Sequence, residues 1–324
     1  LGAGLSSGAQ AWPVEPNRYR LVAAPACPWA NRTLIVRRLL GLEDVISIGR
    51  PGPIHDARSW TFDLDPDGRD PVLGTERLQE NYFARFPDYP RGITVPAIVD
   101  IPSGGVVTND YPQITLDFST QWREYHREGA PDLLPSDLLE EMWTVMQRIF
   151  TEVNNGVYRC GFAGSQQAYE DAYDRLWDTM DWLEDRLASR RFLMGDRITE
   201  ADVRLFTTLV RFDPVYHGHF KTNRNRLTEM PNLWGYAREL FWDGRPGEAL
   251  VDPLSGELVL AAGAALEAQV LGPPLSTVEM GHDGIDWTGV TAKLESARPL
   301  ALATALPSDL ATALASRPGY PQLF

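Results

Sequence analysis

Cys27 is the residue best placed for chemistry, because it stands between an apolar run and the start of an amphipathic helix. Residues 19–24 predict a short buried strand, and from Trp29 onward apolar residues recur at helical spacing. Cys27 then falls at the N-cap, with Pro28 at the first helical position and Arg32 one turn further on. Free N–H groups and the helix dipole favour an anion there, so the sequence predicts a nucleophilic thiolate with a lowered pKa. The alternative is an inert cysteine that fills a strand-to-helix corner.

The composition limits the classes of partner and the cellular location that are expected for such a thiol. The 324 residues carry 30 Lys and Arg against 44 Asp and Glu, a formal net charge of −14, which argues against a nucleic-acid partner. No apolar run approaches the ~20 residues that span a bilayer, so we expect a soluble protein without a membrane partner. Cys27 and Cys160 are far apart and neither belongs to a CxxC pair, which favours a reducing, cytoplasmic location and a monothiol mechanism.

The elements before and after the thiol follow the order of a thioredoxin-like domain. A β-α-β unit leads into a hairpin and then a helix. In that order the Val95–Pro96 bond enters the strand beside the thiol, and it is a candidate cis peptide. The expected elements are a strand over 44–48, a loop-rich insertion over 49–92 with a helix over 76–86, strands over 94–99 and 105–108, and a helix from Ile114.

From about Leu133 the pattern changes to long amphipathic helices, whose apolar stripes are typical of a core. Thr199, with Asp202 three residues later, predicts a capping box. The sequence therefore predicts an all-helical domain packed on the first. The helices are expected over 138–154, 166–189 and 199–212, and the domains over 1–125 (thioredoxin-like), 126–242 (all-helical) and 243–324 (an atypical C-terminal extension).

These motifs, taken in order, resemble the glutathionyl-hydroquinone reductases, the Xi class of the glutathione transferases. The resemblance covers roughly residues 18–242. It rests on Cys27-Pro28-Trp29-Ala30 with Arg32-Thr33-Leu34-Ile35, on Gly41 to Ile46, on Trp60-Thr61-Phe62, on Thr94-Val95-Pro96, on Asn154 to Tyr158 with Gly161-Phe162-Ala163, on Gly195 to Asp202, and on Leu205 to Phe220 with Pro231 to Trp234.

The resemblance implies that the Cys27 thiolate attacks the sulfur of a thioether that joins a low-molecular-weight thiol to a hydroquinone. A mixed disulfide forms, and a second thiol molecule releases it. Tyr158 would donate to the leaving group, although helix–helix packing is an alternative role for it. The resemblance further implies a homodimer without a metal, thiol-binding residues Trp29, Arg32, Trp60, Val95, Pro96 and Asp110, and substrate-binding residues Tyr158 and Tyr216 for an aromatic or quinol substrate.

The sequence departs from the family pattern beside the thiol. Asn31 stands where the family has His, and Asp110-Tyr111 stands where the family has an acidic residue and Ser that hold the glutamyl end of glutathione. The co-substrate thiol is therefore glutathione or mycothiol. Usage rich in Ala, Leu, Arg and Pro indicates a high-GC organism, which favours mycothiol.

The tail is the second departure. The family's closing segment is not recognisable after Trp242, and an apolar segment over 243–324 takes its place. We expect it to cover the cleft above Cys27 and Tyr158 through Trp287 or Tyr320, or to extend the subunit interface. A flexible appendage is the alternative.

Other groups predict less chemistry. His217 and His219 lack a Cys or carboxylate companion at ligand spacing, so we expect a structural loop there. Arg204, Arg211 and Asp213 are expected to form an ion-pair network near the domain interface. The alternative to an enzyme is a ligand-binding or structural protein that kept the transferase fold.

Overall fold

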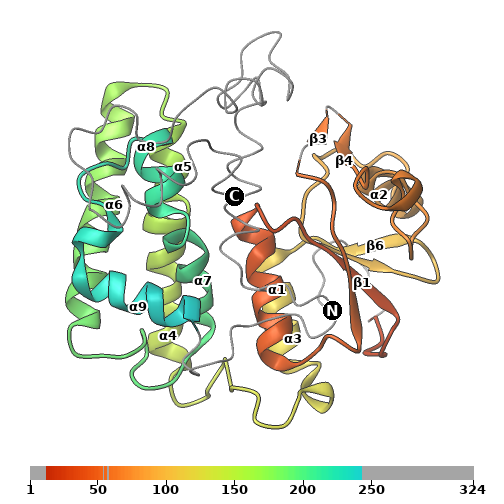
Figure 1. The fold of residues 1–324 in the computed structure, drawn as a ribbon, viewed down its shortest axis with the longest axis horizontal. Coiled ribbons are helices and arrows are strands. Elements are labelled where there is room, and N and C mark those ends of the chain that lie inside the picture. The colour runs from red at the N-terminus through yellow and green to blue at the C-terminus, as the bar shows by residue number, and fades with distance from the viewer. Residues whose placement is uncertain (1–11, 54, 57, 243–324) are drawn as a thin grey trace, which may run out of the picture. The chain divides into compact units, whose positions relative to one another are not determined.

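The computed structural model describes residues 12–242 except 54 and 57, and these residues belong to one compact unit of the chain. A four-stranded sheet with its helices comes first, and a group of helices follows (Figure 1). This confirms the predicted fold class, a thioredoxin-like part followed by a helical part. The domain boundaries stay predictions, and the expectations for 243–324, including Trp287 and Tyr320, lie outside the described residues.

The sheet has the strand order β2-β1-β5-β6. β1 (Tyr19–Val22) pairs in parallel with β2 (Ile46–Gly49) and antiparallel with β5 (Ala97–Asp100), which pairs with β6 (Gly105–Thr108). Every residue of β1, β5 and β6 is buried, and these strands are mostly apolar in the sequence, apart from Arg20, Asp100 and Thr108. β2 and β5 begin two and three residues later than the sequence indicates.

The thiol-bearing helix is α1 (Pro28–Leu40), and Cys27 is its extended N-cap residue (φ −73°, ψ 117°), as predicted. The helix ends at Gly41, whose φ of 74° is the left-handed conformation that favours glycine. A Cβ at Gly41 would lie 2.5 Å from the Cβ of Arg127. α1 packs against α3 (Tyr111–Thr120) and against α7 (Glu200–Leu209), so both parts of the protein hold it in place.

A buried ion pair ties the predicted insertion over 49–92 to the sheet. The carboxylate of Asp70 meets the guanidinium of Arg20 at 2.8 Å, and it also accepts the backbone N–H groups of Val72 and Leu73. The insertion contains η1 (Pro66–Gly68), α2 (Leu78–Arg85) where the sequence predicts a helix over 76–86, and a two-stranded sheet of β3 (His55–Asp56) and β4 (Ser59–Trp60) that the sequence does not indicate.

In the second part, the predicted helix over 138–154 is divided between α4 (Leu139–Arg148) and the π-helical turn η3 (Ile149–Asn154). The buried side-chain amide of Asn154 donates to the carbonyl oxygen of Arg204 and the hydroxyl of Thr208, which ties the turn to α7. The other elements are η2 (Arg123–Tyr125), α5 (Gly156–Gly161), α6 (Gln166–Leu187), η4 (Phe212–Tyr216), α8 (His217–His219), η5 (Leu227–Glu229) and α9 (Pro231–Trp242).

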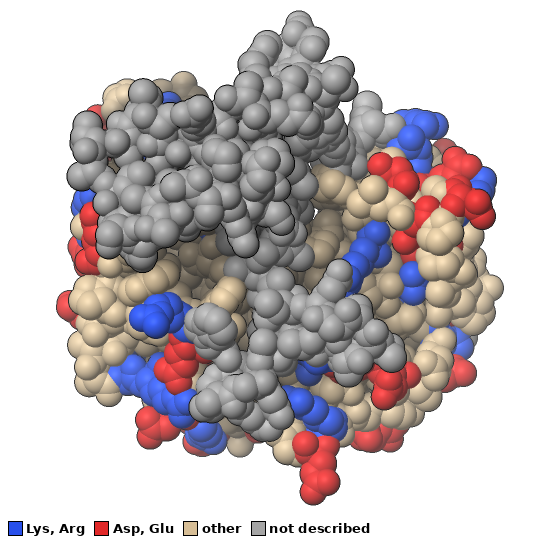
Figure 2. All heavy atoms as spheres, viewed as in Figure 1, with Lys and Arg blue, Asp and Glu red and all other residues tan. Residues whose placement is uncertain are grey.

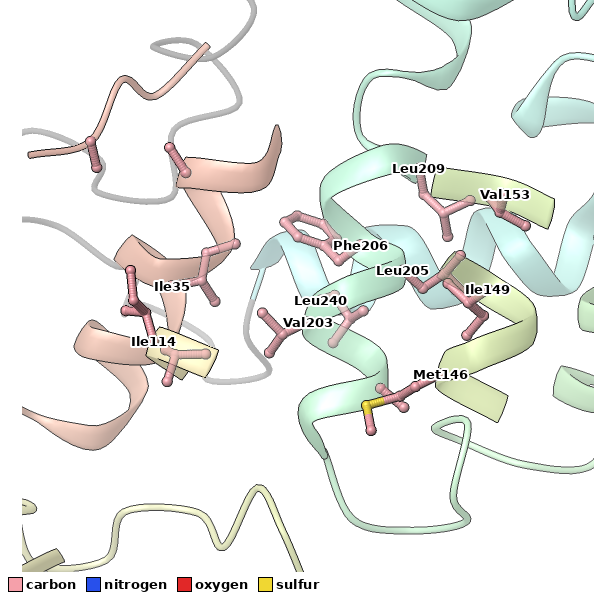
Figure 3. Close-up of a cluster of buried hydrophobic side chains, with 14 of the residues drawn as sticks. Ile35, Ile114, Met146, Ile149, Val153, Val203, Leu205, Phe206, Leu209 and Leu240 are labelled. Atoms are coloured by element: carbon pink, nitrogen blue, oxygen red, sulfur yellow. The ribbon is translucent and has the colours of Figure 1, made fainter. Parts of the chain in front are cut away.

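α7 is the central helix of the second part, and all ten of its residues are buried. It begins with the predicted capping box, in which the carboxylate of Asp202 accepts the N–H of Thr199 at 2.7 Å. Its apolar side chains point to both sides (Figure 3), with Phe206 toward α1 and Leu205 toward η3. α7 therefore sits where the two parts share a core.

The surface charges are mixed. On the described face in Figure 2, acidic and basic side chains are interspersed and do not gather into one basic patch. None of the helices in the described part of the chain combines the length and apolar character that a bilayer crossing needs.

Candidate active site

Cys27 is half-buried at the start of α1, and its Sγ lies 4.0 Å from the carbonyl oxygen of Val95. The Val95–Pro96 peptide bond is cis, as predicted. The backbone carbonyl of Cys27 accepts the N–H of Asn31 at 2.8 Å, but the side chain makes no capping hydrogen bond. The sulfur is therefore available for chemistry.

The prediction of a lowered thiol pKa is wrong in direction. Burial raises the pKa of Cys27, and this cost of moving a thiolate out of water outweighs the groups that act the other way. Those groups are the backbone N–H groups of Ala30 and Trp29, which belong to the first turn of α1, and the guanidinium groups of Arg211 and Arg32. The sequence indicates the helix terminus correctly, but not how far packing removes the thiol from water.

Trp29 is the centre of an aromatic cluster next to the thiol. Its ring centroid lies 4.8 Å from that of Tyr111 and 6.0 Å from that of Phe150. On the same residue, Tyr158 of α5 stacks at 6.2 Å with an angle of 27° between the rings. The hydroxyl oxygens of Tyr158 and Tyr216 lie 3.5 Å apart. Residues from α1, α3, η3, α5 and η4 thus meet at one place.

The two tyrosines are suited to donating a proton or a hydrogen bond. Burial raises the pKa of Tyr158, and the neighbouring Tyr216 raises it further. Burial also raises the pKa of Tyr216, against the lowering effect of the Arg211 guanidinium. Both side chains are therefore neutral phenols at physiological pH. The structure brings together Tyr158 and Tyr216, the two residues predicted to bind the substrate, and that role stays a prediction.

Arg32 is a buried cation in this site. It is 1% exposed, and none of its three guanidinium nitrogens has a hydrogen-bond partner among the described residues. Its guanidinium carbon lies 4.9 Å from the ring centroid of Trp29 and 5.3 Å from that of Tyr111, so cation–π contacts hold it. Burial lowers the pKa of Arg32 to about 10, and the group stays charged at neutral pH.

The predicted network of Arg204, Arg211 and Asp213 does not form as expected. Arg204 pairs with Glu200 at 2.8 Å, whereas Asp213 accepts the backbone N–H groups at the start of η5. Arg211 is 1% exposed and donates to the carbonyl oxygens of three residues: Pro25 at 2.7 Å, Ala26 at 3.2 Å and Thr207 at 2.7 Å. Its contact with the segment before the thiol is a feature that the sequence analysis missed. The only local signal is an arginine directly after an apolar helix.

Two further predicted thiol-binding residues lie on nearby elements. Asp110 is the N-cap of α3, where its carboxylate accepts the N–H of Gln113 at 3.1 Å. Trp60 belongs to β4 and is packed, half-buried, against the core. Their contacts with a bound thiol stay predictions.

The two closely spaced histidines are the remaining candidate group of the sequence. His217 and His219 lie in α8, and the ring of His219 packs 5.2 Å from that of Phe220. Within residues 12–242, leaving aside 54 and 57, no group of three or more His, Cys, Asp or Glu could hold a metal ion.

The family models match both parts of the chain. The glutathione S-transferase N-terminal domain matches residues 26–121, and the glutathione S-transferase C-terminal domain matches residues 166–239. The two models together cover the thiol, α1, strands β2, β5 and β6 of the sheet, α7 and most of α9. This defines the class of protein as a glutathione transferase.

Individual relatives narrow the class. A glutathionyl-hydroquinone reductase of Sphingobium chlorophenolicum, PcpF, is 42% identical over 225 residues, which are 68% of this chain and 70% of the relative. The crystal structure of a glutathione transferase from Gordonia bronchialis is 69% identical with a TM-score of 0.70, covering 71% of this chain and 72% of that one. The glutathione-bound structure of YqjG from Escherichia coli is 36% identical with a TM-score of 0.70, covering 79% of each chain. The chain belongs to the glutathionyl-hydroquinone reductases, the Xi class of the glutathione transferases.

Proposed function

We propose that the protein is a thiol-dependent reductase in which Cys27 cleaves the thioether of a thiol–hydroquinone conjugate. The observation that carries this proposal is the position of the Cys27 thiol at the N-terminus of α1, beside an aromatic cluster that ends in the phenol pair of Tyr158 and Tyr216. The thiol supplies a nucleophile and the phenols supply donors. The names of PcpF and YqjG, both glutathionyl-hydroquinone reductases, support the same reaction.

The reaction balances in two steps. In the first, the Cys27 thiol loses its proton and its sulfur bonds to the thioether sulfur while the bond from that sulfur to the ring carbon breaks. The ring carbon receives the electron pair and takes up a proton, so the hydroquinone leaves and a mixed disulfide remains on Cys27. In the second, the thiolate of a second thiol molecule attacks the sulfur of the bound thiol, and Cys27 leaves as a thiol again. The low-molecular-weight thiol is oxidised to its disulfide, and the conjugate is reduced.

The phenols act on the leaving group. As the C–S bond breaks, the ring carbon takes up the electron pair and a proton, and a neutral phenol is a donor that can supply this proton. Tyr158 can make this contact because its raised pKa keeps the proton on its oxygen. Tyr216 supports it from 3.5 Å.

The co-substrate thiol is glutathione or mycothiol. The glutathione-bound structure of YqjG supports glutathione. Tyr111 favours mycothiol, because its bulky ring, which packs against Trp29 at a tilt of 45°, stands at the start of α3 where the family pattern has a small hydroxyl residue. Mycothiol has no γ-glutamyl end for such a residue to hold. A titration of the oxidised protein with both thiols tests this choice, and a tenfold or greater preference for glutathione would exclude mycothiol.

An adduct experiment separates the enzyme from a non-catalytic binding protein. The protein is mixed with a thioether conjugate of glutathione and a hydroquinone, and its intact mass and the released hydroquinone are measured together. The proposal expects a mixed disulfide on Cys27, release of one hydroquinone per adduct, and turnover once free thiol is added. Binding of the conjugate without an adduct or a product would establish the binding protein instead.

A further inference from the structure

Arg211 contacts both groups of the proposed chemistry through different atoms. Its guanidinium donates to the carbonyl oxygens of Pro25 and Ala26, the two residues directly before Cys27. Its backbone carbonyl accepts the N–H of Tyr216 at 3.2 Å and that of Val215 at 3.1 Å, in the first turn of η4. One residue is thus bonded to the segment that carries the thiol and to the turn that carries a phenol.

Among the described residues, no other residue is hydrogen-bonded both to the segment before Cys27 and to the turn η4. The turn before the thiol has one internal hydrogen bond, from the N–H of Cys27 to the carbonyl oxygen of Ala24 at 3.1 Å. A third donor bond of Arg211, to Thr207, holds the guanidinium against α7. Because every residue of α7 is buried, this bond ties the Arg211 guanidinium, and through it the Cys27 turn, to a helix of the core.

The guanidinium is also a charge without a carboxylate partner among the described residues. Its three bonds go to carbonyl oxygens, so its positive charge is not neutralised and acts on the nearby thiol. Five titratable or charged groups face Cys27. They are Arg32 of α1, Tyr111 of α3, Tyr158 of α5, Tyr216 of η4, and Arg211, which directly precedes η4. The three tyrosines are neutral at physiological pH, so the two arginines supply the charge.

We propose that Arg211 is a positioning residue that holds the Cys27 thiol in register with the phenol pair of Tyr158 and Tyr216 and favours the thiolate by its charge. The proposal rests on the proposed function, since it assigns Arg211 to the same reaction. Two effects follow and can be separated. The forked bonds to Pro25 and Ala26 control alignment, and the charge controls ionisation of the thiol.

Two substitutions separate these effects. Arg211→Lys keeps the positive charge but cannot make both hydrogen bonds to Pro25 and Ala26 at once. Arg211→Gln loses the charge as well as this pair of bonds. Arg37 is the matched control, because it is a buried arginine of α1 that also donates to two carbonyl oxygens, those of Ile46 at 2.6 Å and Glu43 at 2.9 Å, at the far end of the helix from the thiol. Arg37→Lys and Arg37→Gln therefore report the general effect of loosening a buried guanidinium.

The readouts are the thermal unfolding midpoint, the pH midpoint of Cys27 alkylation by iodoacetamide measured on the Cys27 peptide, and kcat and KM for a glutathionyl-hydroquinone. We expect Arg211→Lys to lower kcat by up to about 10²-fold through misalignment with little change in the alkylation midpoint. Arg211→Gln should lower kcat as well and raise that midpoint by about one pH unit. The Arg37 variants should lower thermal stability only.

A wild-type kcat and alkylation midpoint in folded Arg211→Gln would overturn the proposal, and so would equal shifts in the Arg37 variants. If Arg211→Gln does not fold, Arg211→Lys decides by its kcat. The alkylation midpoint needs no turnover, so absence of hydroquinone release from the unaltered protein would refute the proposed function while the role of Arg211 at the thiol is still measured.

Discussion

The hydroxyl oxygens of Tyr158 and Tyr216 lie 3.5 Å apart, although the two residues belong to different helical elements and are 58 positions apart in the chain. Their ring centroids are 5.9 Å apart with an angle of 62°, an edge-to-face arrangement that is favourable for aromatic pairs. The contact places two proton-bearing oxygens together in a buried site. Removal of the Tyr158 hydroxyl would leave Tyr216 without this neighbour.

The first prediction concerns the nucleophile. Cys27→Ser should reduce hydroquinone release to below ~1% of the unaltered rate, because a serine hydroxyl is not ionised at neutral pH and forms no disulfide. Thermal unfolding should change little, since the side chain makes no capping bond. Cys160→Ala is the control, because Cys160 is buried and its pKa is raised to about 11. Retained activity in Cys27→Ser would refute the mechanism.

The second prediction concerns the donor. Tyr158→Phe removes the hydroxyl and keeps the ring that stacks on Trp29. We expect kcat to fall by about 10²–10⁴-fold, the usual contribution of a positioned proton donor, while mixed-disulfide formation with a simple aliphatic disulfide is unchanged. Tyr169→Phe serves as a control, because that hydroxyl donates to the carbonyl oxygen of Lys221 on the surface. An unchanged kcat in Tyr158→Phe would assign the residue to packing.

The third prediction is the pH dependence. A thiol whose pKa is raised stays protonated where a free cysteine is already ionised, so the alkylation rate of Cys27 should rise with pH through a midpoint above that of a free thiol. Burial also raises the pKa of Tyr158 and Tyr216, so no falling limb should arise from phenol ionisation over the same range. Iodoacetamide labelling between pH 6 and 10.5 measures this. A midpoint below that of free cysteine would mean that the helix terminus and the two arginines outweigh burial.

The fourth prediction compares two buried arginines. Arg32 has no hydrogen-bond partner among the described residues, so Arg32→Met should not lower the free energy of unfolding by more than ~1 kcal/mol, since the lost cation–π contacts are offset by removal of unsatisfied donors. Arg20→Met should lower it by about 3–5 kcal/mol, because it leaves the carboxylate of Asp70 buried and unpaired. Urea unfolding of both variants measures the difference.

Because the family resemblance implies that Arg32 binds the thiol, Arg32→Met should raise KM for the co-substrate thiol while stability is kept. That pairing is the expected signature of a group retained for binding, not for folding. Equal losses of stability in both variants would show that Arg32 has a structural role.

The fifth prediction concerns the choice of thiol. Tyr111→Ser removes the ring that packs on Trp29 and near Arg32, and it restores a small hydroxyl at the start of α3. We expect a lower KM for glutathione and a higher KM for mycothiol. Phe86→Ser, a change of an aromatic residue at the end of α2, should leave both constants unchanged. A higher KM for glutathione with a lower KM for mycothiol, or no change in either constant, would contradict the proposed role of Tyr111.

The parts of the site that the sequence predicted depend on neighbours in the chain. The N-cap position of Cys27, the first-turn Pro28 and the capping box of Thr199 with Asp202 all follow from residues within four positions of one another. Short-range hydrogen bonds and φ preferences determine these features, so a single sequence carries their signal. The apolar runs of β1 and β5 predicted strands for the same reason.

The parts that could not be predicted depend on tertiary contacts. The pKa of Cys27 follows from burial by both parts of the fold, which exceeds the local effect of the helix terminus. Arg211 was expected to pair with an acidic neighbour, but it bonds to carbonyl oxygens of the Cys27 segment instead. The expected helix over 138–154 changes to a π-helical turn where the amide of Asn154 reaches α7.

The bond between Arg211 and Pro25 also has a consequence for the newly made protein. The two residues are 186 positions apart, and at about 5–20 residues per second the ribosome needs roughly 10–40 s to synthesise the chain between them. During that interval the Cys27 turn lacks its bonds to Arg211, and for most of it the turn also lacks the cover of α7. We therefore expect nascent chains to react with oxidants at Cys27 more readily than finished molecules, which makes the moment of translation the vulnerable stage in the life of this thiol.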